Sequence, residues 1–232
     1  MSNGGYNQFC PVSMAAEIIC SRWTLLVLRE LVMGSSRFNE LRRGLPSMSP
    51  ALLSKRLKEL EAAGIVIRVA AEREPGVHEY HLTEAGTELR PIIEAIGVWG
   101  HRWVTTEATL KNLDANLLMW DIRRNINTDP MPPCRNTIQF IFKDRPISER
   151  NYWLIVEPNK EVDLCLVDPG FDVDLYVSTD LHSMTELWLG YRTIDQVSED
   201  GRLILTGSRK QAADLRTWLK LSVFANLEKK VA

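Results

Sequence analysis

Basic side chains are concentrated in one stretch of a chain that is otherwise slightly acidic. The 232 residues carry 28 Lys and Arg against 30 Asp and Glu, a net charge of −2, which excludes a strongly basic protein. Four glutamates lie in the window 37–73, together with eight basic residues: Arg37, Arg42, Arg43, Lys55, Arg56, Lys58, Arg68 and Arg73. Because guanidinium and ammonium groups neutralise phosphates, a local patch of this kind suffices for nucleic-acid binding.

A second group with potential chemistry is the thiol of Cys10, which directly precedes Pro11 and an apolar, helix-like run. If Pro11 is the first helical residue, Cys10 lies at the N-cap, where the helix dipole and free N–H groups stabilise a thiolate. A thiolate there would be a candidate for redox sensing. The alternative is that the thiol and the proline merely start the helix.

Other reactive side chains do not assemble into a recognisable site. His78 and His81 are three residues apart in an expected strand, so they would face opposite sides and share no metal. Asp168, Asp172 and Asp174 are explained by a turn. The four cysteines lack zinc-ligand spacing, and we find no nucleophile elbow, P-loop or dinucleotide fingerprint. We therefore expect no metal, no cofactor and no enzymatic activity.

The elements that would position the basic residues are three helices. Apolar residues at helical spacing predict the first helix over residues 23–33 and a short second helix over 37–44. The third is predicted over 49–64, because Ser49 suits the N-cap and Pro50 suits the first helical position.

The third helix would bury one side and expose the other. Leu53, Leu57 and Leu60 recur at i, i+4 and i+7 and form one apolar stripe. A helix in the DNA major groove needs small, polar and basic groups opposite such a stripe. We expect base edges to be contacted by Ser49, Ala51, Ser54 and Lys55, and phosphates by Lys58, Arg37, Arg42 and Arg43. Arg56 lies nearer the stripe and is ambiguous, and the alternative for the whole helix is a solvated amphipathic element.

A hairpin follows the third helix. Residues 65–71 and 79–82 read as strands, and a segment rich in turn residues separates them, with Pro-Gly at its centre. Arg73 and His78 flank the Pro-Gly pair and are expected near the DNA backbone, although a solvated hairpin tip is the alternative. Three helices followed by a basic-tipped hairpin predict a winged helix-turn-helix, in which the third helix reads the groove.

The first hundred residues resemble the HxlR-type transcriptional regulators, relatives of the MarR-type ones. The resemblance covers roughly residues 8–105 and rests on CPV (10–12), RWTLLVLREL (22–31), RFNEL (37–41), LSKRLKELEAAGIV (53–66) and YHLTEAGTEL (80–89). One departure is Cys20-Ser21, where the family usually has small glycine-like residues. The resemblance implies a sequence-specific regulator that binds double-stranded DNA. In some members a cysteine at the place of Cys10 senses oxidants or electrophiles.

A further helix carries a narrow apolar seam. Ile92, Ile96, Trp99 and Trp103 follow one another at spacings of four, three and four, which suits packing against another helix. Intramolecular packing is one interpretation. The resemblance favours a homodimer, because HxlR-type proteins pair through their first and last helices. A two-fold dimer also has the symmetry that palindromic DNA recognition requires.

The pattern changes after about residue 107. A long helix is predicted over 107–126, and four alternating runs within 137–179 then predict an antiparallel meander. Two helices (181–190 and 193–199), a strand (201–207) and a final helix (208–221) complete an expected α+β domain. We expect residues 1–106 to form the DNA-binding and dimerisation domain, and 107–232 to form a ligand-binding or interaction domain.

The second half resembles the sterol carrier protein domain, most specifically over residues 174–219. That resemblance implies a site for an apolar small molecule between a sheet and helices. Its candidate lining residues are Trp153, Met184, Leu187, Trp188, Leu215, Trp218 and Leu219. The alternative is that these side chains simply fill a core, since pocket walls and cores have the same composition.

Composition places the chain among globular proteins rather than membrane proteins. It is 45% apolar and 25% charged, and no apolar run reaches the roughly 18 residues of a membrane span. The N-terminus lacks the features of a signal peptide, so we expect a cytoplasmic protein with reduced thiols and no membrane partner. Two rival functions remain open: a lipid or small-molecule carrier, and a winged helix used only for protein contacts.

Overall fold

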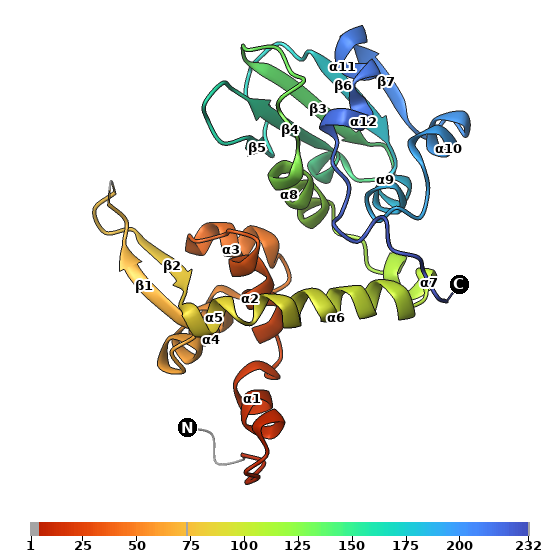
Figure 1. Cartoon of the computed structure of the whole chain (residues 1–232). Coiled ribbons are helices and arrows are strands. Elements are labelled where there is room, and N and C mark those ends of the chain that lie inside the picture. The colour runs from red at the N-terminus through yellow and green to blue at the C-terminus, as the bar shows by residue number, and fades with distance from the viewer. Residues whose placement is uncertain (1–4, 73, 232) are drawn as a thin grey trace. The chain divides into compact units, whose positions relative to one another are not determined.

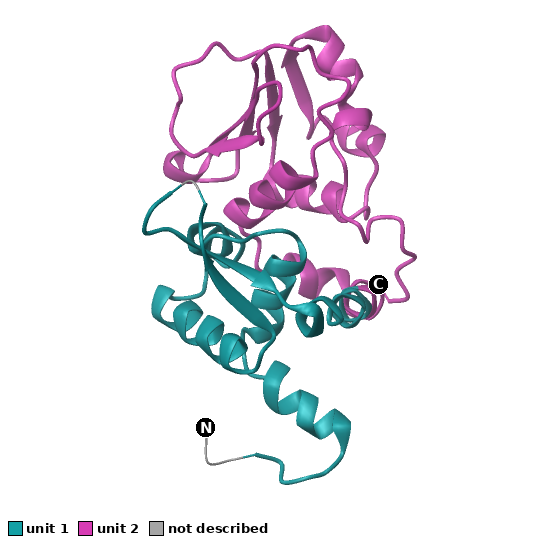
Figure 2. Ribbon diagram, turned by 60° about the vertical axis from the view of Figure 1, so that its left-hand side comes forward, with its two compact units in different colours: residues 1–97 teal, residues 98–232 magenta. Residues whose placement is uncertain are grey.

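The computed structural model describes residues 5–72 and 74–231. The chain forms two compact units, residues 1–97 and 98–232 (Figure 2), each with its own apolar core. Helix α6 (Arg90–Trp103) contributes residues to both units. The domain boundary that we expect after residue 106 therefore stays a prediction.

The N-terminal unit is a winged helix-turn-helix, as predicted (Figure 1). Its elements in chain order are α1 (Pro11–Ile19), α2 (Thr24–Val32), α3 (Phe38–Gly44), α4 (Pro50–Ala62), β1 (Val66–Ala70), β2 (His78–Leu82), α5 (Glu84–Thr87) and the first part of α6. The helix expected from residue 23 begins one residue later, because Trp23 has a left-handed backbone with φ of 79°.

Helix α4 forms for the reasons that the sequence predicts. The Ser49 hydroxyl accepts a hydrogen bond from the Leu52 amide (3.3 Å), and proline occupies the first helical position. Leu53, Leu57 and Leu60 are at most 1% exposed. Burying each of them contributes roughly 2 kcal/mol. This packing fixes the rotation of the helix and leaves the opposite side exposed.

An ion pair within α2 is linked to α3 through Arg29. The Glu30 carboxylate is fully buried and is bound by the Arg29 guanidinium at 2.6 Å and by the Ser35 hydroxyl at 3.3 Å. Arg29 also donates to the carbonyl of Gly44 at 2.8 Å. A buried charge is tolerated when it is paired and hydrogen-bonded in this way. The contact sets the distance between the first two helices of the motif.

The hairpin is the wing of the motif. β1 and β2 are antiparallel, with Val66 opposite Leu82 and Ala70 opposite His78. Beyond the paired strands, the Ala71 amide donates to the Val77 carbonyl at 2.9 Å. A two-stranded hairpin is only marginally stable by itself. Its position therefore depends on contacts with the helices.

The C-terminal unit contains a five-stranded mixed sheet. Its strands are β3 (Asn136–Phe142), β4 (Asn151–Val156), β5 (Asp163–Cys165), β6 (Leu175–Thr179) and β7 (Ile204–Gly207), in the order β5-β4-β3-β6-β7. The predicted antiparallel meander is wrong for β6, which pairs parallel with β3. The segment 166–174 crosses to the far side of β3. There Asp174 fixes the start of β6, because its carboxylate accepts from the Thr137 amide at 2.8 Å.

Two helices expected as single elements are each divided in two. The helix predicted over 107–126 is α7 (Thr106–Leu110) followed by α8 (Ala115–Asn125). It is interrupted because Asp114 caps α8 by accepting from the Leu117 amide at 3.0 Å. The predicted final helix is α11 (Arg209–Ala213) followed by α12 (Leu215–Trp218). The predicted helices at 181–190 and 193–199 are confirmed as α9 (Leu181–Trp188) and α10 (Ile194–Glu199).

The core of this unit lies against one face of the sheet. Phe140, Leu154 and Val177, from three adjacent strands, are fully buried there with side chains of α8, α9 and α12. Successive strand residues alternate between faces. The other face therefore carries a different set, which includes Trp153, Ile155, Tyr176 and Ile204.

Within the described part of the chain, no single helix is both long enough and apolar enough to cross a membrane. Helices α1 and α2 meet those criteria only as a pair, and they are bent by 83° at the break between them.

Candidate nucleic-acid interface

The outer face of α4 brings together the residues predicted to contact base edges. Ala51, Lys55 and Lys58 are exposed, and Ser54 is half-buried beside them. A shallow surface depression is lined by Ala51, Ser54, Lys55, Lys58, Glu59 and Ala62. Ser49 caps the same helix and is also exposed. The predicted face is therefore continuous and accessible from solvent.

Lys58 is the clearest candidate for a phosphate contact on this face. It is exposed and forms no ion pair with any residue that the structure describes. Lys55 lies 4.0 Å from the Glu59 carboxylate, one helical turn along, but both side chains are largely exposed. An exposed pair of this kind contributes at most about 1 kcal/mol. It would yield readily to a DNA phosphate.

Arg56 does not belong to the exposed face. Its side chain is 15% exposed, pairs with Glu59, and donates from Nε to the carbonyl of Arg22 at 3.0 Å. That carbonyl lies just before α2. Arg56 therefore links α4 to the segment that precedes α2.

Arg42 and Arg43 lie in the last turn of α3, and both are exposed. Positive charge at this end of a helix is favourable, because it compensates the partial negative charge of the last carbonyls. The position also keeps both guanidinium groups at the surface of the unit, where they are accessible to a phosphate.

Arg37, also predicted to meet a phosphate, is occupied by two carboxylates. Its guanidinium lies 2.7 Å from Glu74 and 3.4 Å from Glu79, both in the hairpin. The hydrogen bond and charge of Glu74, followed by those of Glu79, raise the pKa of Arg37. Sequence reasoning missed both glutamates as partners, because they lie 37 and 42 residues away along the chain.

A groove separates α3 from the wing. It is lined by Arg37, Phe38, Asn39, Glu40, Arg43, Arg68, Glu74, Val77, His78 and Tyr80. His78 is half-buried in this groove, and Arg68 is exposed on β1. Arg68 belongs to the basic window of the sequence, but the predicted DNA contacts do not include it. The other predicted wing residue, Arg73, lies outside the described residues.

The predicted seam on α6 is exposed. Ile92 and Ile96 are 44% and 46% exposed, and Trp99 and Trp103 are 61% and 52% exposed. Helix α1 also exposes apolar side chains, among them Val12 and Met14. Large apolar side chains at regular spacing on a surface helix mark a protein contact more often than a solvated face.

Cys10 occupies the predicted N-cap of α1. Pro11 is the first helical residue, and the Met14 amide donates to the Cys10 carbonyl at 3.0 Å. The thiol is exposed and free. Cys20, at the other end of α1, is likewise an exposed free cysteine. Both thiols are therefore accessible to a reagent, whereas a sensing role stays a prediction.

The predicted ligand-lining residues do not form one wall. Six of them lie in the closed core between sheet and helices: Met184, Leu187, Trp188, Leu215, Trp218 and Leu219. Trp153 is adjacent to Leu154, which faces that core, so strand alternation places Trp153 on the opposite face of the sheet. Any single cavity lined by this set would have to exclude Trp153.

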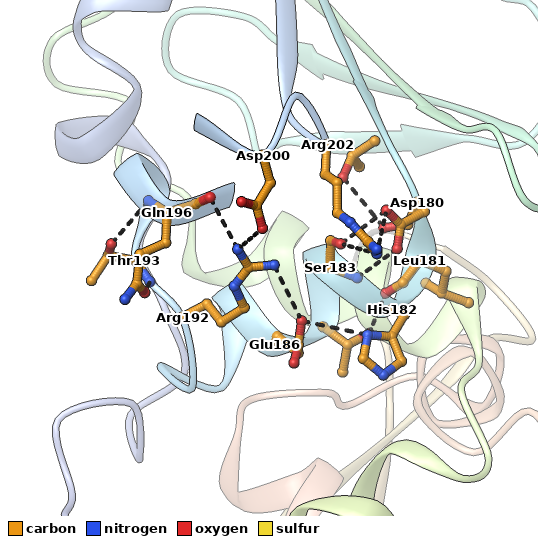
Figure 3. Close-up of polar contacts among 12 residues, drawn as sticks. Asp180, Leu181, His182, Ser183, Glu186, Arg192, Thr193, Gln196, Asp200 and Arg202 are labelled. Atoms are coloured by element: carbon orange, nitrogen blue, oxygen red, sulfur yellow. Dashed lines mark hydrogen bonds and ion pairs between the residues drawn. The ribbon is translucent and has the colours of Figure 1, made fainter. Parts of the chain in front are cut away.

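A polar network holds α9, which supplies three of those core residues (Figure 3). Asp180 caps the helix by accepting from the amide and the hydroxyl of Ser183 at 2.8 and 2.9 Å, and Arg202 approaches the same carboxylate at 3.7 Å. Further along the helix, Glu186 lies 3.4 Å from His182 and 3.9 Å from Arg192. The network fixes the helix with its apolar side toward the core.

The fold defines the N-terminal unit as a winged helix-turn-helix, which is a class of DNA-binding domain. The chain belongs to the HxlR-like helix-turn-helix family, whose model matches residues 18–108. It is 39% identical to the HTH-type transcriptional regulator YvaP of Bacillus subtilis, over 42% of this chain and 92% of YvaP. For YybR of the same organism the identity is 40%, over 39% and 73% of the two chains.

Solved structures with similarity to this chain include two redox-related proteins. The reduced form of the transcriptional regulator YodB from B. subtilis is 33% identical and covers 42% of this chain and 96% of its own, with a TM-score of 0.37. The redox regulator HypR in its reduced form is 38% identical and covers 39% of this chain and 90% of its own, also with a TM-score of 0.37.

Proposed function

We propose that this protein is a sequence-specific transcriptional regulator that binds operator DNA as a homodimer in the cytoplasm. The observation that carries the proposal is the division of α4 into a fully buried leucine stripe and an exposed face with Lys55 and Lys58. A recognition helix requires that division, because one side must be fixed by the core while the other enters the major groove.

The contacts follow from the position of each residue on the motif. Ser49, Ala51, Ser54 and Lys55 lie on the N-terminal half of α4, the part of a recognition helix that meets base edges. Lys58 lies farther along, and Arg42 and Arg43 project from α3. We assign these three to phosphates, which fix the register without reading sequence. We assign His78 and Arg73 to contacts with the DNA backbone near the wing.

A homodimer would place two copies of α4 against one DNA duplex. Support for this assembly comes from the exposed seam on α6 and from the exposed apolar residues of α1. Two-fold symmetry would set the recognition helices about 34–36 Å apart, one turn of DNA, and would match a palindromic operator.

Footprinting on the promoter region of the protein's own gene tests this function. We expect a protected palindromic site, and we expect Lys55→Ala to weaken protection there more than binding to mixed-sequence DNA. A winged helix used only for protein contacts would give neither protection nor salt-dependent DNA binding.

For the C-terminal unit we propose a sensory role with an apolar small molecule, as the sterol carrier protein resemblance implies. Its support is a single large apolar core enclosed between one sheet face and the helices. Native mass spectrometry of the purified protein tests for a retained ligand. A ligand that is bound with no effect on operator affinity would favour the alternative of a lipid or small-molecule carrier.

Control by thiol modification is a further part of the proposal. It is supported by the position of the exposed Cys10 thiol at the N-cap of α1. A bulky or charged adduct there would disturb α1, one of the two helices that we assign to the dimer contact.

A further inference from the structure

The backbone before α3 is joined directly to the wing. Arg37 and Glu79 form an isolated antiparallel β-bridge. Next to it, the Tyr80 amide donates to the Ser36 carbonyl at 2.8 Å. A short extended segment thus pairs with β2 from outside the hairpin. The hairpin itself has two strands, so this third segment is a substantial part of its support.

The side chain of Arg37 forms a second connection between the segment before α3 and the wing. One guanidinium lies 2.7 Å from the Glu74 carboxylate in the turn and has Nε 3.4 Å from Glu79 in β2. The fork geometry of arginine allows one residue to bind two acceptors at once. The turn of the wing and the adjoining end of β2 are therefore held by the same group.

The same residue is also fixed from the helix. The Glu40 carboxylate accepts from the backbone amides of Ser36 and Arg37, at 2.9 and 3.0 Å. Glu40 belongs to the first turn of α3. Arg37 is consequently bound on its backbone side by α3 and on its side-chain side by the wing.

Two carboxylates already neutralise the charge of Arg37. A phosphate that displaced them would leave Glu74 and Glu79 uncompensated close to the DNA backbone, where negative charge is unfavourable. A phosphate contact with Lys58 carries no such cost, because Lys58 pairs with no described residue. Of the two, the charge of Arg37 is much the less available to DNA.

We propose that Arg37 is a positioning residue of the wing and not a phosphate ligand. It clamps the wing to α3 through Glu74 and Glu79, and it thereby holds the wing in place for DNA without making a phosphate contact of its own. The proposal deepens the proposed DNA-binding function and rests on it for the effect on DNA. The clamp itself can be measured without DNA.

The first test is hydrogen exchange on the whole protein. Arg37→Gln is expected to speed exchange several-fold at the amides of Ala71 and Tyr80, which are bonded within the wing and to Ser36. Arg42→Gln removes an exposed arginine of α3 and is expected to leave those amides unchanged. Unchanged exchange in Arg37→Gln would overturn the clamp.

The second test measures the salt dependence of binding to a mixed-sequence duplex. The double variant Arg37→Gln/Glu74→Gln keeps the net charge of the parent and removes the shorter ion pair. For a positioning residue, the slope of log K against log salt stays that of the parent, while Lys58→Gln lowers it by about 0.9. A drop of about 0.9 in the double variant would identify Arg37 as a phosphate ligand and would overturn the proposal.

The two tests separate this proposal from the proposed function. If the parent protein binds no DNA at any salt concentration, the proposed function fails, and hydrogen exchange still decides whether the clamp exists. If the parent binds DNA and the double variant loses slope, the proposed function stands and the positioning role fails.

Discussion

Gly44 lies directly against the buried carboxylate of Glu30: a Cβ added to Gly44 would be 1.9 Å from Oε2 of Glu30. The contact lies where α2 and α3 meet. Arg29 binds both partners at once, the carboxylate through an ion pair and Gly44 through its carbonyl. The absence of a side chain at residue 44 is thus what allows the ion pair to be buried.

We expect Gly44→Ala to destabilise the N-terminal unit, because either the helices must separate or the ion pair must shift. Overpacking of this kind costs about 1–3 kcal/mol. Urea unfolding followed by circular dichroism measures it. Gly100→Ala is the control, because a Cβ on Gly100 meets nothing within 4 Å. Equal midpoints for the parent and Gly44→Ala would show that the contact is not rigid.

Substitutions of Lys58 and Arg56, which are two residues apart on α4, should affect different properties: DNA binding for Lys58 and stability for Arg56. Arg56→Ala removes the bond to the Arg22 carbonyl, so we expect a lower melting temperature. Lys58→Ala should keep the melting temperature and reduce the salt slope of DNA binding by about 1, without changing sequence preference. Thermal melts and binding titrations on both variants distinguish these effects. A Lys58→Ala protein that binds DNA like the parent at every salt concentration would show that α4 does not lie in the DNA groove.

The seam on α6 predicts a concentration-dependent dimer. Trp99→Asp places a charge at the most exposed position of the seam, so we expect dissociation to monomers in sedimentation velocity runs. Operator affinity should fall with it, since one half-site binds weakly alone. Glu94→Gln, on the same helix but outside the seam, is the control. A parent that is monomeric at high concentration would contradict the assignment.

Stability should fall on acidification through His101. Its Nε2 lies 3.2 Å from the Leu227 carbonyl, and the ring lies 5.5 Å from that of Tyr191. Burial, with smaller effects of Lys229 and Arg102, lowers the pKa of His101. The unfolded chain then binds the proton more readily, so stability is fully present above the ordinary histidine pKa and declines as the pH falls below it.

Melting curves of the parent and of His101→Gln between pH 5 and pH 8 measure this effect. The parent should lose more stability than the variant on the acidic side. Parallel curves for the two proteins would show that another group controls the acid response.

The position of Cys10 at the N-cap of α1 predicts that modification of its thiol affects DNA binding. Alkylation of Cys10 should weaken operator binding in the parent, whereas the same treatment should leave binding by Cys10→Ser unchanged. Mass spectrometry identifies the adduct and gives the rate at which it forms. A thiol that reacts at the rate of a free model thiol, with an adduct that DNA binding ignores, would leave Cys10 as a helix start.

The parts of the fold that depend on local signals were predictable. Helix α4 follows from signals within its own sequence: Ser49 as the cap, Pro50 at the first position and the leucine stripe at helical spacing. The hairpin follows from its turn residues. Asp114 is also a local signal, since an aspartate before an apolar run indicates a helix start and thus the division of the helix predicted over 107–126.

The parts that depend on distant partners were not predictable. Strand alternation identifies β6 but does not say that it pairs with β3 rather than β5. Arg37 was assigned to DNA because its charge is visible in the sequence, whereas the glutamates that occupy it are brought close only by the fold. The same limit explains why Trp153 was grouped with residues on the opposite face of the sheet.

The most direct test of the central claim compares binding of the full-length protein to its own promoter duplex and to a mixed-sequence duplex across a salt series. We expect tighter binding to the promoter duplex at every salt concentration, together with a steep salt slope on both. We also expect Lys55→Ala to reduce the preference between the two duplexes. Equal affinity for both duplexes, or a preference that Lys55→Ala leaves intact, would contradict the assignment of α4 as the helix that reads DNA.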